Sequence, residues 1–187
     1  MLAYVVAHGA LPCPLSIDNP RPGADAESDR PNCSNSLGGV PAAQLAMDGA
    51  VNESGALLDA WGRAYRYIVS SENHGTKGDV DSLDWTTATD ASDIGLESMS
   101  ASLVLCSRSV ETSCPGSATR ASNIAFVILS QGENINSSAL QNENVDDDNI
   151  FVLSEYSIEE QAIYDDYLAW LSAEEALYWM LRAGWLP

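Results

Sequence analysis

The sequence predicts a single domain with helices at its two ends and strands between them. Three observations lead to this prediction. The length of 187 residues suits one domain of ordinary size. Apolar residues make up 45% of the chain, which is enough to bury a core. Residues 173–183 lie between clear helix start and stop signals, whereas residues 123–130 are apolar nearly throughout, as a central strand is.

The first part of the chain predicts a short helix followed by a long loop. Residues 1–7 are apolar, and Gly9 stands where a helix C-terminus usually has glycine. Residues 11–40 contain five of the eight prolines, which favours an irregular loop. Residues 41–48 begin with proline, a residue suited to the first helical position, and predict one or two helical turns.

Four strands are predicted in the middle of the chain from runs of aliphatic, aromatic and β-branched residues. They are expected at residues 63–69, 102–107, 123–130 and 150–153. The polar residues 71–100 predict a second long loop with a helical turn near 90–96, and residues 131–148 predict a third loop. Residues 159–170 are compatible with a strand and with a helix.

The C-terminal helix has the clearest local signals. Ser172 is a good N-cap, and Glu175 three residues later completes a capping box. The predicted helix spans residues 173–183 and is closed by Gly184. We expect the tryptophans to pack in the core rather than to bind a ligand. They stand at positions 61, 85, 170, 179 and 185.

Charge and composition exclude several classes of function. The chain has 27 acidic and 8 basic residues, a net charge of -19, which argues against binding nucleic acid or an anionic membrane surface. Its two histidines, His8 and His74, are far apart and leave few candidates for acid–base catalysis near neutral pH. No phosphate-binding loop and no Gly-x-Ser-x-Gly motif is present. We therefore expect no enzymatic activity and no organic cofactor.

Four cysteines predict two disulfides. They are Cys13, Cys33, Cys106 and Cys114, and their spacings differ from those of a zinc ribbon. Of the three possible pairings, the sequence-local one joins the first two and the last two, because it closes two short loops without special topology. Each bridge is worth roughly 2–4 kcal/mol. The alternative is four reduced thiols in the cytosol.

Three acidic clusters lie at residues 79–84, 143–148 and 165–166. Calcium prefers several oxygen ligands supplied by loops, so Glu143, Asn144, Asp146 and Asp148 are the predicted calcium ligands. These residues lack the spacing and the central glycine of an EF-hand. The alternative is a solvated acidic loop. A carboxylate pair for glycoside hydrolysis is a further alternative that residue spacing does not select.

Six stretches follow one another in the order seen in a known family. Residues 2–14 look like the junction of a long N-terminal helix with a globular head. Residues 59–67 look like an Asp-x-Trp-Gly turn leading into a strand, and residues 125–134 like a strand followed by Ser-x-Gly-x-Asn. Residues 143–148 precede a Phe-Val strand, and the stretches 164–172 and 183–187 complete the series. The chain thereby resembles the type IV pilin-like proteins, which include minor pilins and the pseudopilins of type II secretion.

The resemblance implies an α+β head in which the N-terminal helix packs on an antiparallel sheet, with long disulfide-pinned loops and a C-terminal helix. It implies a structural subunit that acts in filament assembly, at the tip or in adhesion, without catalysis. Its partners are other pilin-like subunits. Residues 1–10 are then the end of a longer helix that holds the protein in the inner membrane before assembly into a periplasmic or cell-surface filament. The competing hypothesis is a secreted or periplasmic enzyme or binding protein with an acidic site.

Overall fold

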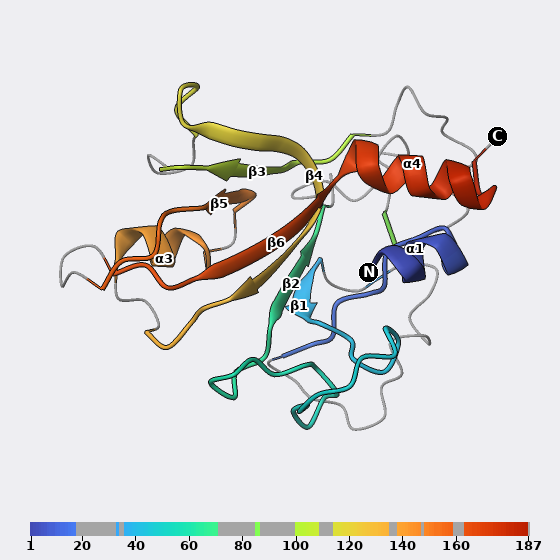
Figure 1. Cartoon of the computed structure of the whole chain (residues 1–187), viewed down its shortest axis with the longest axis horizontal. Coiled ribbons are helices and arrows are strands. Elements are labelled where there is room, and N and C mark those ends of the chain that lie inside the picture. The colour runs from blue at the N-terminus through green and yellow to red at the C-terminus, as the bar shows by residue number, and fades with distance from the viewer. Residues whose placement is uncertain are drawn as a thin grey trace.

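The protein has an α+β fold (Figure 1). The computed structural model describes residues 1–17, 33, 36–70, 85–86, 100–108, 114–134, 138–146, 148–158 and 163–186. Its elements in chain order are α1 (Leu2–His8), β1 (Leu37–Gly39), β2 (Arg66–Val69), β3 (Leu103–Cys106), β4 (Thr119–Ser130), α3 (Ala139–Glu143), β5 (Ile150–Val152), β6 (Tyr167–Ser172) and α4 (Ala173–Ala183).

The described strands form one mixed sheet around β4. Strands β3 and β2 pair antiparallel with successive stretches of β4, and β6 pairs antiparallel with β4 from Ile124 to Ser130. The expected all-antiparallel sheet is wrong at one place, because β5 is parallel to β3, with Val104 opposite Ile150. Strand β5 lies on the outer side of β3, runs in the same direction as β3 and is therefore opposite in direction to β4.

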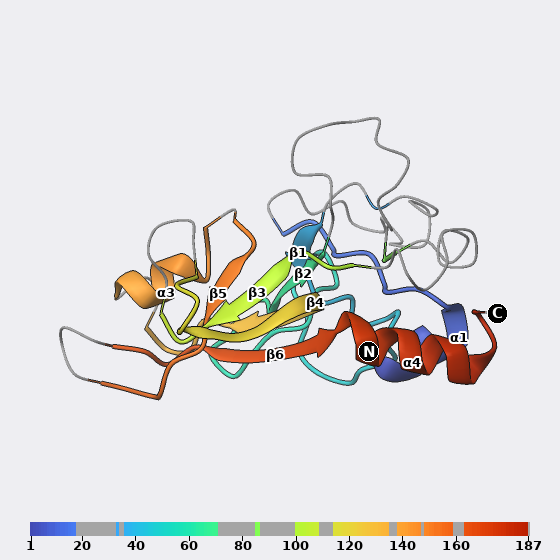
Figure 2. The ribbon, with the colours of Figure 1, turned by 90° about the horizontal axis from the view of Figure 1, so that it is seen from above.

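Helix α4 forms as its local sequence predicts. The Ser172 hydroxyl accepts a hydrogen bond from the Glu175 N–H at 3.2 Å, and Gly184 closes the helix in the left-handed conformation. Helix α1 lies beside α4 (Figures 1 and 2), and the Trp185 indole N–H donates to the Val6 carbonyl at 2.9 Å. The expectation that the N-terminal helix packs on the sheet is corrected in part. Helix α1 packs on α4, which in turn contacts β4 and β6, while Val5 of α1 joins the core cluster that contains Phe126 and Leu171 of the sheet.

Two apolar clusters stabilise the sheet. Alternate residues of a strand point to opposite faces, so Phe126 belongs to one cluster and its neighbour Val127 to the other. The first cluster includes Val5 of α1 and Met180 of α4. The second is formed by Leu103, Leu105, Ile124, Val127 and Phe151.

Some local predictions do not agree with the structure. Strand β1 lies in a stretch expected to be a loop, and α3 lies in the loop expected at 131–148. Residues 42–46 form turns rather than helix, with Ala46 at a φ of 49°. The ambiguous stretch 159–170 is a strand from Tyr167 onward. The helical turn expected near 90–96 and the acidic cluster at 79–84 lie outside the described residues.

The tryptophans do not all pack in the core. Trp85 is buried, but Trp61, Trp170 and Trp185 are each about 40% exposed. The prediction was wrong for these three, because Trp170 lies on a strand at the border of the sheet and the other two lie in turns. Trp61 stacks on Tyr167 instead, with ring centroids 6.5 Å apart.

Both disulfides form in the predicted sequence-local pairing. The Cα atoms of Cys13 and Cys33 are 5.4 Å apart, and those of Cys106 and Cys114 are 5.8 Å apart. We expect the folded protein to contain no free thiol. Alkylation under denaturing conditions without reductant should leave the intact mass unchanged, whereas reduction before alkylation should add four labels. Four labels without reductant would contradict the prediction.

Candidate functional site

The predicted calcium ligands lie around the turn that joins α3 to β5. Helix α3 begins at Ser138, whose hydroxyl accepts a hydrogen bond from the Gln141 N–H. Beyond its end, the Asp146 carboxylate accepts a hydrogen bond from the Asp148 N–H at 3.3 Å. The Asp148 carboxylate accepts one from the Ile150 N–H at 2.7 Å. These short-range bonds shape the turn, as aspartates do in loops.

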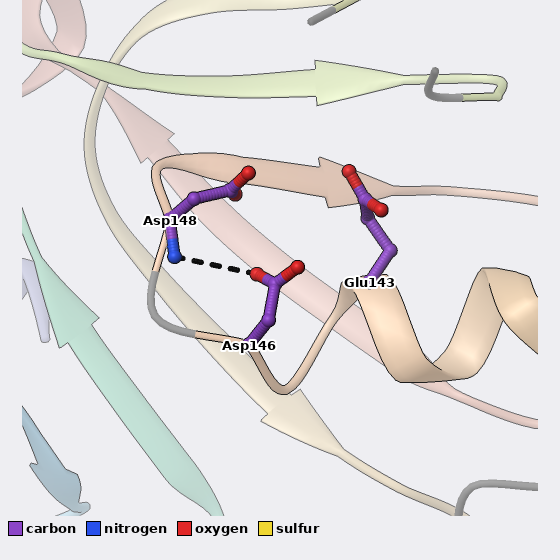
Figure 3. Close-up of side chains that lie close together, drawn as sticks. All are labelled: Glu143, Asp146 and Asp148. Carbon is purple, nitrogen blue, oxygen red and sulfur yellow. Dashed lines mark hydrogen bonds between the residues drawn. The ribbon is translucent and has the colours of Figure 1, made fainter. Parts of the chain in front are cut away.

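Three carboxylates converge in this turn. Glu143, Asp146 and Asp148 point toward a common space (Figure 3), and each offers an oxygen within 4.8 Å of the others. Two oxygens on one calcium ion, each about 2.4 Å from it, lie at most about 5 Å apart, so the spacing fits a shared cation. Burial raises the pKa of Asp148, and repulsion from Asp146 acts in the same direction. A cation there would offset this repulsion.

Asn144, the fourth predicted ligand, does not join the carboxylates. Its side chain is buried and turned toward β5 and the start of β6. Its Oδ1 accepts from the Val152 N–H at 2.6 Å, and its Nδ2 donates to the Val152 carbonyl at 3.0 Å and to Asp166 at 2.8 Å. These bonds hold Asn144 as a structural bridge between β5 and the 165–166 pair.

The third acidic cluster, Asp165 and Asp166, is buried, which the sequence analysis did not predict. The two residues are only 6% and 7% exposed. Asp165 accepts hydrogen bonds at one oxygen from the N–H groups of Glu133 and Asn134 at 2.8 and 2.9 Å, and at the other from Gln141 Nε2 at 2.5 Å. The signal in the sequence was the position of the pair between two tyrosines, directly before an apolar strand.

These bonds form a clamp, which we define as Asp165 and Asp166 together with Gln141, Asn144 and the backbone of 133–134. In the part of the chain that the structure describes, the side chains that donate to Asp165 and Asp166 are uncharged amides rather than lysine or arginine. Burial raises the pKa of Asp166 to about 6, and repulsion from Asp165 acts in the same direction. The hydrogen bonds from Asn144 and Gln141 lower this pKa but do not cancel the effect of burial. The clamp ties the segment that carries the three convergent carboxylates to the start of β6.

A cavity of about 320 Å³ lies beside the convergent carboxylates. Its lining includes Asp146, Asp148, Arg66 and the apolar side chains of Ile68 and Phe151. The Arg66 guanidinium donates to the Val145 carbonyl at 3.1 Å and so attaches the acidic turn to β2. The opening leaves space for waters that would complete the coordination of an ion held by the turn.

Comparison with protein-family models, with characterised proteins and with solved structures finds no match for this chain. The family resemblance noted in the sequence therefore remains a prediction. Within the described ranges, no helix combines the length and the apolar character needed to cross a membrane.

We expect calcium to bind at the three carboxylates and to raise the melting temperature, because an ion that binds only the folded state stabilises it. Isothermal titration with calcium chloride measures the binding, and thermal denaturation with and without chelator measures the stabilisation. Asp146→Asn should abolish both effects, whereas Asp48→Asn, which removes an exposed charge elsewhere, should preserve them. Absence of heat together with an unchanged melting temperature would contradict the prediction.

Proposed function

We propose that this chain is the head of a pilin-like structural subunit that assembles into a bacterial filament. The support comes from the six stretches that resemble this family. Although they are spread along the chain, hydrogen bonds join each of them to at least one other within the described structure. The order of these six stretches along the sequence is the observation that carries the proposal.

The stretches 59–67 and 125–134 meet at the end of β4. The Asp59 carboxylate accepts a hydrogen bond from the Ser130 hydroxyl at 2.7 Å. The Arg63 guanidinium donates to the carbonyls of Gly132 and Glu133, the latter at 2.9 Å. The Asp-x-Trp-Gly turn and the Ser-x-Gly-x-Asn turn therefore stabilise each other.

Two further pairs of stretches are joined in the same way. Residues 2–14 meet residues 183–187 where the Trp185 indole donates to the Val6 carbonyl. The indole ring packs so closely on Gly9 that an added Cβ there would lie 2.6 Å from it. Residues 143–148 meet residues 164–172 where Asn144 donates to Asp166. These bonds place the six stretches within one folded unit, which is compatible with the family resemblance.

The proposed role is structural rather than catalytic. The subunit is expected at the inner membrane and in the periplasm before assembly, and in a periplasmic or cell-surface filament afterwards. Disulfides suit these oxidising compartments. Val6 of α1 is 39% exposed, so this helix presents an apolar side chain that neighbouring subunits would cover.

The test is crosslinking of the protein in its native cell envelope, followed by identification of the attached chains. The expected result is recovery with other pilin-like subunits. The genome should also encode, ahead of Met1, an apolar stretch of about 20 residues preceded by a basic leader. Recovery only as a free protein, without such a stretch in the gene, would exclude the filament role.

A second candidate function is that of a secreted calcium-binding protein. It is favoured by the convergence of Glu143, Asp146 and Asp148 within 4.8 Å. The two candidates are distinguished by the envelope experiment: a calcium-binding protein is recovered alone, and removing calcium changes its stability without releasing any filament subunit.

A further inference from the structure

Strand β6 forms an open border of the sheet. It is hydrogen-bonded to β4 on one side, and within the described residues no strand or bridge pairs with its other side (Figure 2). The alternate backbone N–H and C=O groups on that outer side are therefore available to another strand. Its sequence, Tyr-Leu-Ala-Trp-Leu-Ser, carries no charge in a chain in which 19% of residues are charged.

The open edge lacks the devices that normally prevent strand addition. Edge strands of monomeric proteins are usually short or carry lysine, proline or a bulge. Strand β6 has six residues. Its register with β4 is unbroken from Leu171 to Tyr167, because the register shift of this pair lies on β4 between Ile124 and Phe126. Tyr167 is 59% and Trp170 40% exposed, so aromatic side chains stand on both faces of the open edge.

The charges near β6 indicate what kind of segment it accepts. Glu174 and Glu175 are exposed just beyond its C-terminal end. The Glu174 carboxylate accepts a hydrogen bond from Asn123 Nδ2 of β4 at 2.6 Å, so Glu175 is the residue considered for a partner. At the other end, the Arg63 guanidinium is already bonded to two backbone carbonyls. The net charge of -19 opposes self-association of two copies of the chain.

We propose that the outer edge of β6 binds an extended segment of another protein, added antiparallel, with uncharged residues along β6 and lysine or arginine at its N-terminal end. In this orientation the basic end lies beside the first turn of α4, where Glu175 is exposed. Backbone hydrogen bonds supply affinity, and contacts with Tyr167 and Trp170 add apolar burial. The inference does not depend on the filament role, and its test uses the isolated protein.

The probe is the acetylated, amidated peptide Lys-Lys-Thr-Val-Thr-Phe-Thr-Val. Binding is measured by calorimetry, and hydrogen exchange reports the protection of β6 amides. We expect a dissociation constant below about 1 mM with slowed exchange in residues 167–172. A peptide with N-methylated alternate amides and a peptide that begins Glu-Glu should each bind at least about tenfold more weakly.

Matched variants locate the binding on the protein. Ala169→Lys places an exposed charge in the middle of the edge and should weaken binding of the probe at least about tenfold. Tyr178→Lys, at a 53% exposed position on α4, should leave binding unchanged. Thermal denaturation first shows whether both variants are folded like the parent protein. The N-methylated peptide is a control that uses only the parent protein and therefore does not depend on a variant that folds.

Three results would overturn the proposal. The first is no binding of the probe up to about 1 mM, and the second is binding that the N-methylated peptide reproduces. The third is a dimer of the chain alone in analytical ultracentrifugation that Ala169→Lys dissociates, because a second copy would then be the natural occupant.

Discussion

Replacing Gly132 with alanine is expected to lower the free energy of unfolding by about 4 kcal/mol. Gly132 has a φ of +64°, a conformation that is unfavourable for any residue with a Cβ. An added Cβ would overlap the Asp165 backbone oxygen and lie 2.5 Å from the Cγ of the same residue. Asp165 cannot move away without losing its hydrogen bonds from Glu133, Asn134 and Gln141. Denaturant titration of both proteins measures the difference.

Gly62→Ala is the matched control for this prediction. Gly62 also has a positive φ, +76°, but no atom lies within 4 Å of the position of its Cβ. The substitution should therefore cost only the backbone strain, about 1 kcal/mol. Equal losses for the two variants would show that the clamp around Asp165 contributes nothing beyond the local backbone conformation.

The second large effect is a dependence of stability on pH that Asp166 causes. The pKa of its carboxyl group is about 6 in the folded protein and about 3.9 in the unfolded chain. The folded state therefore binds the proton more tightly. The free energy of unfolding should rise as the pH falls from 7 through 6, and the gain should be complete below about 4. The full gain is up to about 3 kcal/mol.

Asp166→Asn should abolish this gain and raise the stability at pH 7, because the buried group is then uncharged at every pH. Its remaining oxygen still accepts a hydrogen bond from Asn144. Denaturant titrations at pH 7.0, 5.5 and 4.5 measure both effects. Asp48→Asn removes one negative charge from an exposed site and controls for the net charge. An unchanged pH profile in the Asp166 variant would contradict the prediction.

Local sequence signals were sufficient for some elements. Helix α4 has the predicted bounds, because an N-cap, a capping box and a terminal glycine act within a few residues of one another. The apolar run 123–130 is strand, and the structure extends it back to Thr119, where β3 supplies a hydrogen-bonding partner.

Other elements depend on contacts that are distant in sequence. Strand β1 has two glycines and low strand propensity, yet it pairs with β2, and the missing side chain of Gly38 makes room for the Leu15 carbonyl. Strand β5 pairs parallel with β3, a strand more than 40 residues earlier in the chain, and no local pattern predicts this partner.

The candidate calcium site divides in the same way. Glu143, Asp146 and Asp148 are close in sequence, so a turn between a helix and a strand is enough to bring their carboxylates together. Asn144 belongs to the same stretch, but the peptide groups of Val152 and the carboxylate of Asp166 bind its side chain. Composition identified the acidic loop, and packing decided which of its side chains lie close together.

By itself, the sequence predicted helices and strands in one domain, the sequence-local disulfide pairing, the strongest strand and the C-terminal helix. Each of these depends mainly on composition or on a short stretch of the chain. Only the tertiary structure decided that Asp165 and Asp166 are buried and that β6 has an open edge. Burial depends on which segments pack over a side chain. A strand has an open edge when no other strand pairs with that side, as is the case for β6 among the described residues. Both are properties of the whole arrangement of the chain rather than of any stretch within it.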